Sequence, residues 1–326
     1  MLRTVFILTV LMTGIGCSPD APHENPLDPF HQSFSENQFT FRGQVLQKNP
    51  PHNPLSGCLI FLQPEKKYTQ ADEQGRFEFI SLQNGEHQAV IIKPGFDSTL
   101  IAINFDTLTS ASIPFYLNGK PFLKSAAIYS EYIDQWWPDP RVFLLMSISV
   151  GDPDGIGDLK ELRLEIPGLN LSFPFSATAK TDSFYLRLDE LQFPENSLFP
   201  LVGQETKVVL IDASDSKITD ATYRLLRIIN TSPLTKTPTG LQTISATPTF
   251  VWEPYLTTFT FSYEISVFVI SAGIPLLIHR KKLPDDTQTR YVYPASLSSG
   301  TYFWTIGIRD KFGNFSRSKE ASFLVQ

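Results

Sequence analysis

Residues 257–270 read TTFTFSYEISVFVI, and they alternate between apolar and polar side chains. Successive side chains of a β-strand point to opposite faces, so an alternating run predicts a strand with one buried face. The buried face is predicted to comprise Phe259, Phe261, Tyr263, Ile265, Val267 and Val269. Ser271-Ala272-Gly273 then turns the chain into a second apolar run, PLLIHRKKL. The pattern predicts β-structure in this part of the chain.

The residues around this run extend the pattern to a whole module, residues 229–326. Trp252 lies on an early strand, TPTFVWEP, and Leu297, Gly300 and Tyr302 have the layout of a tyrosine corner. A last hairpin is indicated by Asp310, Gly313, Asn314 and Ser316. The segment resembles a fibronectin type III domain, from which it departs by a second tryptophan, Trp304, after the corner. The resemblance implies a β-sandwich.

Residues 38–118 carry another run of strand and turn signals. Asp72 and Gly75 predict a tight turn, and Phe77 and Phe79 then point to one face of a strand. Asn84-Gly85 predicts a hairpin. With Leu82 and Gly95, these residues resemble the carboxypeptidase regulatory-like domain, a small transthyretin-like sandwich. The resemblance implies a structural appendage without catalytic residues.

Residues 119–228 are predicted to form an immunoglobulin-like sandwich. The stretch RVFLLMSISVGDPDGIGDLKELRLEI, residues 141–166, is typical of a strand, an acidic loop and a second strand. Similar strand–DPDG–strand segments occur in bacterial Ig-like modules. The sequence therefore predicts an all-β chain of three tandem β-sandwich modules.

The first 37 residues have a different character. Met1-Leu2-Arg3 and an apolar run over residues 4–13 are typical of a secretory signal that is too short to span a bilayer. Because Cys17 follows Gly16 directly, residues 1–16 resemble a bacterial lipoprotein signal peptide. The resemblance implies lipidation of Cys17, with palmitate or similar acyl chains as the membrane anchor. The alternative is an ordinary signal peptide with an incidental cysteine.

The residues after the cysteine bear on where the protein would be held. Residues 17–37 are rich in proline, asparagine, serine and acidic residues, which predicts a disordered tether. Ser18, rather than aspartate, follows Cys17. By the sorting rule of the lipoprotein family, this residue implies the outer membrane of a bacterial cell envelope.

Charge and cysteine content exclude some functions. The formal net charge is −6, and the one compact basic run, residues 279–282, is read as a solvated strand face. Nucleic-acid binding is therefore not expected. Two cysteines are too few for a disulfide framework, and Cys58 is expected to be a small buried hydrophobic residue.

Motifs that carry catalytic chemistry are absent from the sequence. It holds no G-x-S-x-G, H-E-x-x-H, Walker or dinucleotide motif. The protein is therefore predicted to be non-enzymatic, without a catalytic residue and without a cofactor other than a candidate Ca²⁺. Sandwich folds can host enzymes, so an undetected site remains the third alternative.

The acidic loop is the one candidate metal site. Asp152, Asp154 and Asp158 could offer carboxylate oxygens to Ca²⁺. The loop is not an EF-hand, since Ile156 and Arg163 occupy positions five and twelve. The alternative is a plain turn, in which aspartate side chains cap backbone amides.

Trp136-Trp137 is the candidate ligand-binding feature. Exposed aromatic rings stack on sugars or anchor partner proteins, whereas packing between modules is the alternative.

The sequence supports two hypotheses for the function of the protein. The leading hypothesis is a non-enzymatic envelope lipoprotein, held at the membrane by its lipid, that acts as a structural, scaffold or adhesion protein. The second is a carbohydrate-binding surface lipoprotein that assists glycan uptake.

Overall fold

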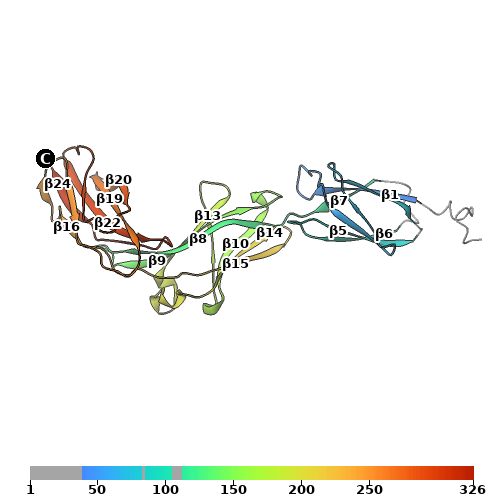
Figure 1. Cartoon of the computed structure of the whole chain (residues 1–326), viewed down its shortest axis with the longest axis horizontal. Helices are drawn as coiled ribbons and strands as arrows, with labels where there is room; N and C mark the ends of the chain where they lie inside the picture. The colour runs from blue at the N-terminus through green and yellow to red at the C-terminus, as the bar shows by residue number, and fades with distance from the viewer. Residues whose placement is uncertain (1–38, 83–84, 105–111) are drawn as a thin grey trace, which may run out of the picture. The chain divides into compact units, whose positions relative to one another are not determined.

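The computed structural model describes residues 39–82, 85–104 and 112–326 (Figure 1). Contacts divide these residues into two compact units. The first contains the described residues up to Pro94 together with Ser98–Leu117, and the second contains Gly95–Asp97 and Asn118–Gln326. The predicted leader, Cys17 and the tether lie outside the described residues. The chain is all-β, as predicted, and is built of tandem β-sandwich modules.

The first unit consists of two facing sheets, with strand orders β4-β1-β7 and β3-β2-β5-β6. Its core is aromatic: the rings of Phe77 and Phe79 are 6.0 Å apart, and both are buried on one face, as the sequence predicts. The strands of this unit are β1 Phe39–Gln47, β2 Leu59–Gln63, β3 Lys67–Gln70, β4 Arg76–Leu82, β5 Glu86–Ile92, β6 Thr99–Asn104 and β7 Ser112–Leu117.

The turn before β4 forms as predicted. The Asp72 Oδ1 atom accepts hydrogen bonds from the backbone amides of Gln74 and Arg76, at 2.9 and 2.7 Å. Gly75 has a φ of +71°, and a Cβ atom at this position would lie 2.4 Å from the Val45 carbonyl oxygen. The turn therefore requires glycine for its backbone angle and for its close approach to β1.

The predicted hairpin at Asn84-Gly85 is wrong. β4 pairs with β1, whereas β5 pairs with β2 and β6 in the other sheet. β4 and β5 therefore belong to different sheets and do not pair with each other; Asn84 itself lies outside the described residues. An Asn-Gly pair favours a reversal of the chain, but it does not determine which strand becomes the hydrogen-bonding partner.

The second sandwich, at the start of the second unit, has its own hydrophobic core. Leu144 of β9, Leu164 of β10 and Val208 of β14 are among its fully buried side chains. The elements are β8 Phe122–Ile133, β9 Arg141–Gly151, β10 Leu159–Ile166, β11 Leu171–Pro174, β12 Ser176–Ala177, β13 Ser183–Asp189, β14 Thr206–Asp212 and β15 Lys217–Tyr223, with short 3₁₀ turns η1 Ile156–Asp158, η2 Pro167–Leu169, η3 Glu190–Gln192, η4 Pro194–Asn196 and η5 Phe199–Leu201.

The third sandwich confirms the alternation of residues 257–270. Tyr263, Ile265 and Val267 are buried in its core, and Phe259, Phe261 and Val269 pack against the same core. The strands are β16 Thr235–Thr237, β17 Gln242–Ile244, β18 Thr249–Trp252, β19 Phe261–Ser271, β20 Ile274–Leu283, β21 Arg290–Val292, β22 Gly300–Asp310, β23 Phe315–Arg317 and β24 Ala321–Val325.

The aromatic residues of this module lie where the fibronectin-like pattern predicts. Trp252 is buried, and its ring centroid is 5.3 Å from that of Tyr263. The Tyr302 hydroxyl donates a 2.8 Å hydrogen bond to the Ser298 carbonyl, which closes the tyrosine corner. Trp304, the departure from the pattern, is also buried, and its Nε1 donates to the Pro238 carbonyl at 2.8 Å.

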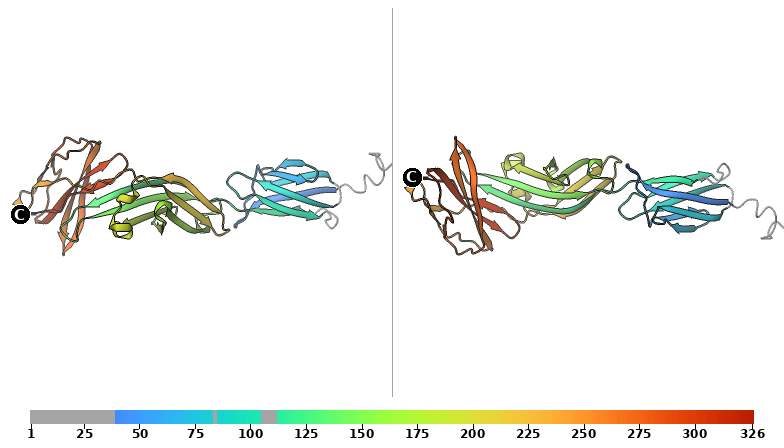
Figure 2. Two further views of the ribbon diagram at one scale, coloured as in Figure 1. Left: turned by 90° about the horizontal axis from the view of Figure 1, so that it is seen from below. Right: turned by 90° about the horizontal axis from the view of Figure 1, so that it is seen from above.

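The second and third sandwiches keep separate cores but share one ten-stranded sheet. β23 of the third pairs in parallel with β8 of the second, so that Phe315 lies opposite Glu131 and Arg317 opposite Ile133. Eight of the strands run in the order β12-β13-β9-β8-β23-β22-β19-β20; the other two are β24, which pairs with β22, and β17, which pairs with β24. Figure 2 shows the long strands β8 and β9 side by side in green.

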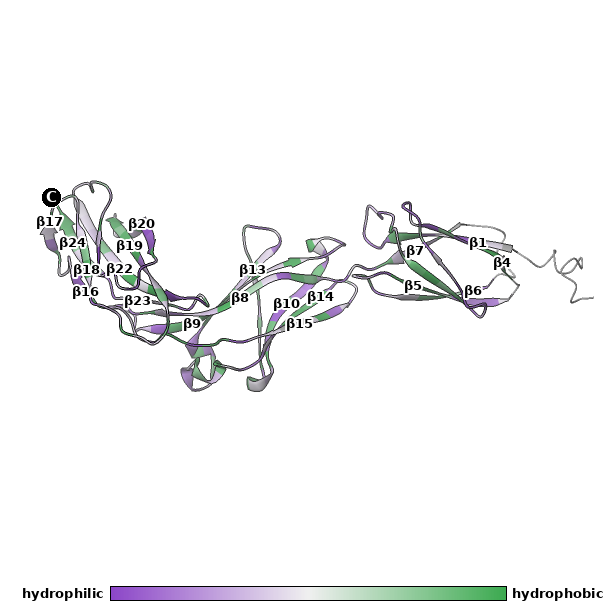
Figure 3. Cartoon of the chain, in the orientation of Figure 1, coloured by the Kyte–Doolittle hydropathy of each residue, from purple (hydrophilic) through white to green (hydrophobic). Residues whose placement is uncertain are grey.

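The basic run, residues 279–282, lies on the outer strand β20. Residues 279–282 are purple at the hydrophilic end of β20 in Figure 3. Arg280, Lys281 and Lys282 are exposed, so the basic run lies on a solvated strand face, as predicted. Among the described residues, no helix is long and apolar enough to cross a membrane.

Candidate functional site

The acidic loop joins the two sheets of the second sandwich. β9 ends at Gly151 and β10 begins at Leu159, and the two strands belong to different sheets. The loop is folded by local hydrogen bonds: the Gly155 amide donates to the Asp152 carbonyl, and the Asp158 amide donates to the Gly155 carbonyl, both at 3.0 Å. These turns place the aspartates on the same side of the loop.

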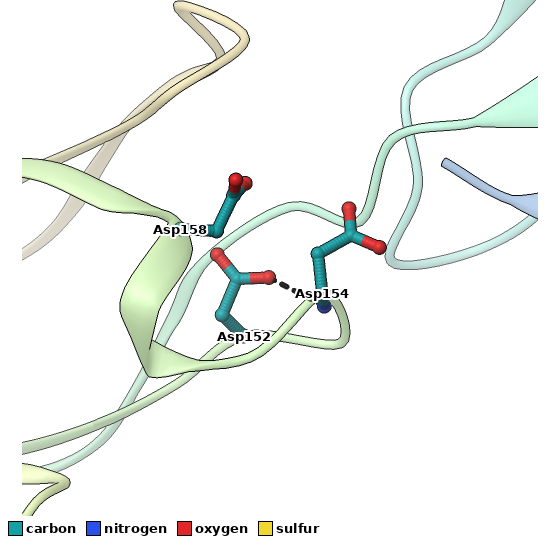
Figure 4. Close-up of side chains that lie close together, drawn as sticks. All are labelled: Asp152, Asp154 and Asp158. Atoms are coloured by element: carbon teal, nitrogen blue, oxygen red, sulfur yellow. Dashed lines mark hydrogen bonds between the residues drawn. The ribbon is translucent and has the colours of Figure 1, made fainter. Parts of the chain in front are cut away.

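The structure brings the three predicted aspartates together. One carboxylate oxygen from each of Asp152, Asp154 and Asp158 lies within 4.8 Å of the others. Figure 4 shows the three side chains rising from the same side of the loop, with the Asp154 amide donating to Asp152. We call these three residues the acidic cluster.

Turn capping accounts for one oxygen each of Asp152 and Asp154. The Asp154 backbone amide donates to Asp152 Oδ1 at 2.7 Å, and the Gly119 amide donates to Asp154 Oδ2 at 2.6 Å. The other oxygens, Asp152 Oδ2 and Asp154 Oδ1, are buried, and no donor of the described residues reaches them. Capping therefore explains only part of the arrangement.

The surroundings of Asp152 disfavour its charged form. No ion pair within the described ranges includes Asp152 or Asp154. Burial, together with smaller contributions from the charges of Asp158, Asp154 and Asp212, raises the pKa of Asp152 to about 6. A buried, unneutralised carboxylate takes up a proton or a metal ion in preference to remaining charged alone.

Two neighbouring residues were not predicted from the sequence. Asp212, at the end of β14, is fully buried, and its Oδ1 accepts from the backbone amides of Ser214 and Ser216. Asn118 is 7% exposed and donates from Nδ2 to Asp212 Oδ2 at 2.7 Å. The one sequence signal was the ASDS turn after the apolar strand at Asp212. Nothing marked Asn118.

Asn118 links the acidic cluster to the segment where the second unit begins. Its Nδ2 also donates to Asp97 Oδ2 at 3.0 Å, and Asp97 is paired with Lys120 at 3.4 Å. The next residue, Gly119, contacts Asp154 through its amide. Asn118 Oδ1 is buried and has no hydrogen-bond donor in the described part of the chain. The donor atoms gathered here are oxygens, the ligands that hard cations such as Ca²⁺ and Mg²⁺ take.

The predicted tryptophan pair lies on the surface. Trp137 is 86% and Trp136 is 70% exposed, which is incompatible with packing between modules as their main role. Trp136 is nevertheless held in place: its Nε1 donates to the Glu320 carbonyl at 2.8 Å, and Lys319 Nζ lies 4.4 Å from the ring centroid. Trp136 therefore presents aromatic surface from a fixed position, next in sequence to the exposed Trp137.

A groove of about 390 Å³ lies beside this position, and the sequence did not predict it. It lies on the face of β19 opposite the core, where Phe268 and Phe303 stack with ring centroids 4.6 Å apart. Glu264 lies 3.6 Å from Arg280 and 3.5 Å from Arg309 across the groove. Glu320, whose carbonyl holds Trp136, also lines it. The available signal was Phe268, which with Ile270 interrupts the polar face of residues 257–270.

Cys58 and His87, two further residues that could carry chemistry, are buried in the first unit. Cys58 is fully buried, as predicted, and its thiol donates to the Leu55 carbonyl at 3.2 Å. Burial raises the pKa of the Cys58 thiol, which disfavours the reactive thiolate. His87 lies in β5, buried, with Nδ1 2.8 Å from Glu65 Oε1. Cys17 lies outside the described residues, so its lipidation stays a prediction.

No protein-family model and no curated protein sequence matches this chain. Solved structures with similar folds include the major pilin subunit BcpA of Bacillus cereus, with 10% identity, a TM-score of 0.28, and coverage of 88% of this chain and 96% of that one. The fibronectin(III)-like modules of Clostridium thermocellum CbhA have 10% identity, a TM-score of 0.30, and coverage of 63% and 92%. The FN1–FN3 domains of chicken CNTN1 have 8% identity, a TM-score of 0.32, and coverage of 84% and 92%.

These similarities concern fold class alone. The chain itself is all-β and is built of sandwich modules. Identities of 8–10% and TM-scores near 0.3 carry no argument about ligand or activity.

Proposed function

We propose that this protein is a non-enzymatic cell-envelope lipoprotein that acts as a structural, scaffold or adhesion protein. Its lipid anchor would be attached to Cys17, at the outer membrane, and residues 17–37 would tether the β-sandwich modules to it. The first module would serve as a structural appendage, as its resemblance to the carboxypeptidase regulatory-like domain implies.

The shared sheet of the second and third sandwiches is the observation that supports this role. Hydrogen bonds between β8 and β23 join two separate cores into one body. Modules joined only by a linker move relative to one another, whereas a scaffold or adhesion protein needs modules that hold a fixed spacing. The β8–β23 hydrogen bonds are therefore consistent with a scaffold or adhesion role.

Replacement of Cys17 tests the anchor directly. The Cys17→Ser variant should lose incorporation of labelled palmitate and move from the membrane fraction to the soluble fraction. Cys58→Ser is the matched control, because Cys58 is the other cysteine and is fully buried. If the Cys17→Ser variant stays membrane-bound and labelled, the lipoprotein proposal is wrong.

Carbohydrate binding is the second candidate, and the exposed tryptophans support it. Trp136 and Trp137 present rings beside a groove that contains the Phe268–Phe303 stack and charged side chains. Aromatic platforms flanked by hydrogen-bonding groups suit sugar rings, which have an apolar face and polar edges.

A glycan pull-down with the full-length protein separates the two candidates. If the protein binds carbohydrate, it should retain soluble polysaccharide, and Trp137→Ala should reduce the amount retained. Tyr68→Ala is the matched control, since Tyr68 is a similarly exposed aromatic residue of the first unit. Equal retention by both variants would remove the carbohydrate reading and leave the scaffold proposal untouched.

A further inference from the structure

We propose that the second sandwich binds one Ca²⁺ ion, held by the acidic cluster of Asp152, Asp154 and Asp158 and completed by the amide oxygen of Asn118. The proposal goes beyond the scaffold role and does not depend on the lipid anchor. Its basis is three buried oxygen atoms, Asp152 Oδ2, Asp154 Oδ1 and Asn118 Oδ1, that no hydrogen-bond donor of the described residues reaches.

The first argument concerns the two capped aspartates. In a plain acidic turn, the carboxylate oxygens either accept from backbone amides or face water. Here one oxygen of Asp152 and one of Asp154 accept such bonds, and the second oxygen of each is buried without a donor. Burying a carboxylate oxygen without a partner costs free energy, and a bound cation removes that cost.

Asn118 supplies the second, independent argument. The residue is 7% exposed, and its Nδ2 donates to Asp212, a carboxylate outside the cluster. The backbone amide of the next residue, Gly119, donates to Asp154 of the cluster. Its Oδ1 is a buried acceptor with no donor. Unlike the aspartates, Asn118 is neutral and comes from a distant part of the sequence, so it is not another member of an acidic run.

The packing around Gly119 shows that the segment of Asn118 and Gly119 lies close to the acidic loop. A Cβ atom at Gly119 would lie 2.7 Å from Cβ of Pro153, which leaves no room for a side chain between the two segments. Glycine at this position lets the backbone amide reach Asp154. The segment that carries Asn118 is therefore packed tightly against the loop.

The donor set and its spacing select Ca²⁺. All the atoms that would coordinate the metal are oxygens, from carboxylates and an amide. These are hard ligands, and no imidazole or thiolate is among them. Two oxygens that bind the same Ca²⁺ at about 2.4 Å can be at most about 4.8 Å apart. The aspartate oxygens lie within that distance of one another. Mg²⁺ needs shorter bonds and near-octahedral geometry, so it suits the cluster less well.

The experiment is a thermal melt of the full-length protein in detergent after removal of metal by EDTA. Addition of about 2 mM CaCl₂ should raise the Tm of the second unit by about 5 °C or more if the free ion exceeds its Kd about 100-fold. Isothermal titration with CaCl₂ should give one ion per chain. The same concentration of MgCl₂ should give a much smaller shift.

Variants locate the ion. Asp152→Asn keeps an oxygen for the Asp154 amide but loses a charge, so Ca²⁺ affinity should fall by about tenfold or more, because affinity follows ligand charge. The Asn118→Ala variant should also bind Ca²⁺ more weakly. Asp215→Asn is the matched control: it is an exposed aspartate of the same module, paired with Lys160, and should leave binding unchanged.

Each outcome decides the question. No Tm shift and no heat with Ca²⁺ would overturn the proposal, and so would an equal response to Mg²⁺. Equal loss in the control and cluster variants would indicate a diffuse charge effect and would also overturn it. In EDTA, the Asp152→Asn variant should be at least as stable as the natural chain, since it removes a buried charge. This measurement shows that lost binding does not reflect lost folding.

Discussion

The backbone amide of Ser130 donates a 2.9 Å hydrogen bond to Oδ1 of Asn314, 184 positions later in the chain. Ser130 lies in β8 of the second sandwich, and Asn314 lies in the turn between β22 and β23 of the third. Both residues are buried, and Asn314 also donates from Nδ2 to Asp310 at 3.0 Å. The two sandwiches are thus joined by a side chain as well as by the β8–β23 ladder.

Replacement of Asn314 should weaken this joint. Asn314→Ala leaves the buried Ser130 amide without its partner and removes the side-chain hydrogen bond to Asp310, which keeps its contact with Arg227; the expected cost is about 2–3 kcal/mol of unfolding free energy. Urea unfolding measures the change. The exposed Asn230→Ala substitution is the control and should cost less than about 0.5 kcal/mol. A similar small loss in both variants would show that the bond contributes little.

The raised pKa of Asp152 predicts how the metal-free protein responds to pH. The folded protein holds this proton more tightly than the unfolded chain, because burial and the charges of Asp158, Asp154 and Asp212 raise the pKa from 3.8 to about 6. Stability should therefore increase as pH falls from 7 to 5, by about 1 kcal/mol from this group.

The comparison that isolates this effect uses Asp152→Asn. Urea unfolding in EDTA is measured at several pH values for both proteins, and the difference in free energy should change between pH 5 and 7. A difference that is flat over this range contradicts the raised pKa. With Ca²⁺ present, the stabilisation by the ion should shrink below about pH 6, since protons compete for the same oxygen atoms.

The tyrosine corner predicts a local loss of stability. Tyr302→Phe removes the hydroxyl that bonds the Ser298 carbonyl, and the expected cost is about 1 kcal/mol. Tyr185→Phe is the control, because Tyr185 is a half-exposed strand residue. Equal melting temperatures for the two variants would mean that water replaces the corner bond without loss.

Gly75 provides a test of backbone strain in the first unit. Gly75→Ala places a Cβ atom 2.4 Å from the Val45 carbonyl oxygen and should destabilise the unit by more than the roughly 1–2 kcal/mol of a positive φ alone. Gly273 has a similar φ of +79° with open space around it. Gly273→Ala therefore measures the backbone cost by itself, and the two variants should differ clearly in circular-dichroism melts.

Local patterns were enough to predict the elements of the fold. The alternation of residues 257–270 predicted which side chains enter the core, because that choice depends only on the period of a strand. The Tyr302 corner and the Asp72 turn were also local, and both formed. Pairing depends on tertiary contacts instead, so the hairpin at Asn84-Gly85 was wrong and the β8–β23 pair was not foreseen.

The candidate site also contains residues that local sequence predicted and residues that only tertiary folding brings together. Asp152, Asp154 and Asp158 are close in sequence, so their spacing was visible as a possible oxygen cluster. Asn118 joins them only through tertiary folding, and its neighbour Asp212 is 94 positions away along the chain. The exposure of Trp136 and Trp137 also depended on whether a neighbouring surface covers them, which a linear pattern does not state.

The β8–β23 pair also limits how this chain could be rearranged by gene duplication and recombination. A cut near residue 228 would leave each half with a core of its own but with a newly exposed sheet edge, and exposed edges invite pairing with other chains. We therefore expect the second and third sandwiches to be exchanged together and not one at a time.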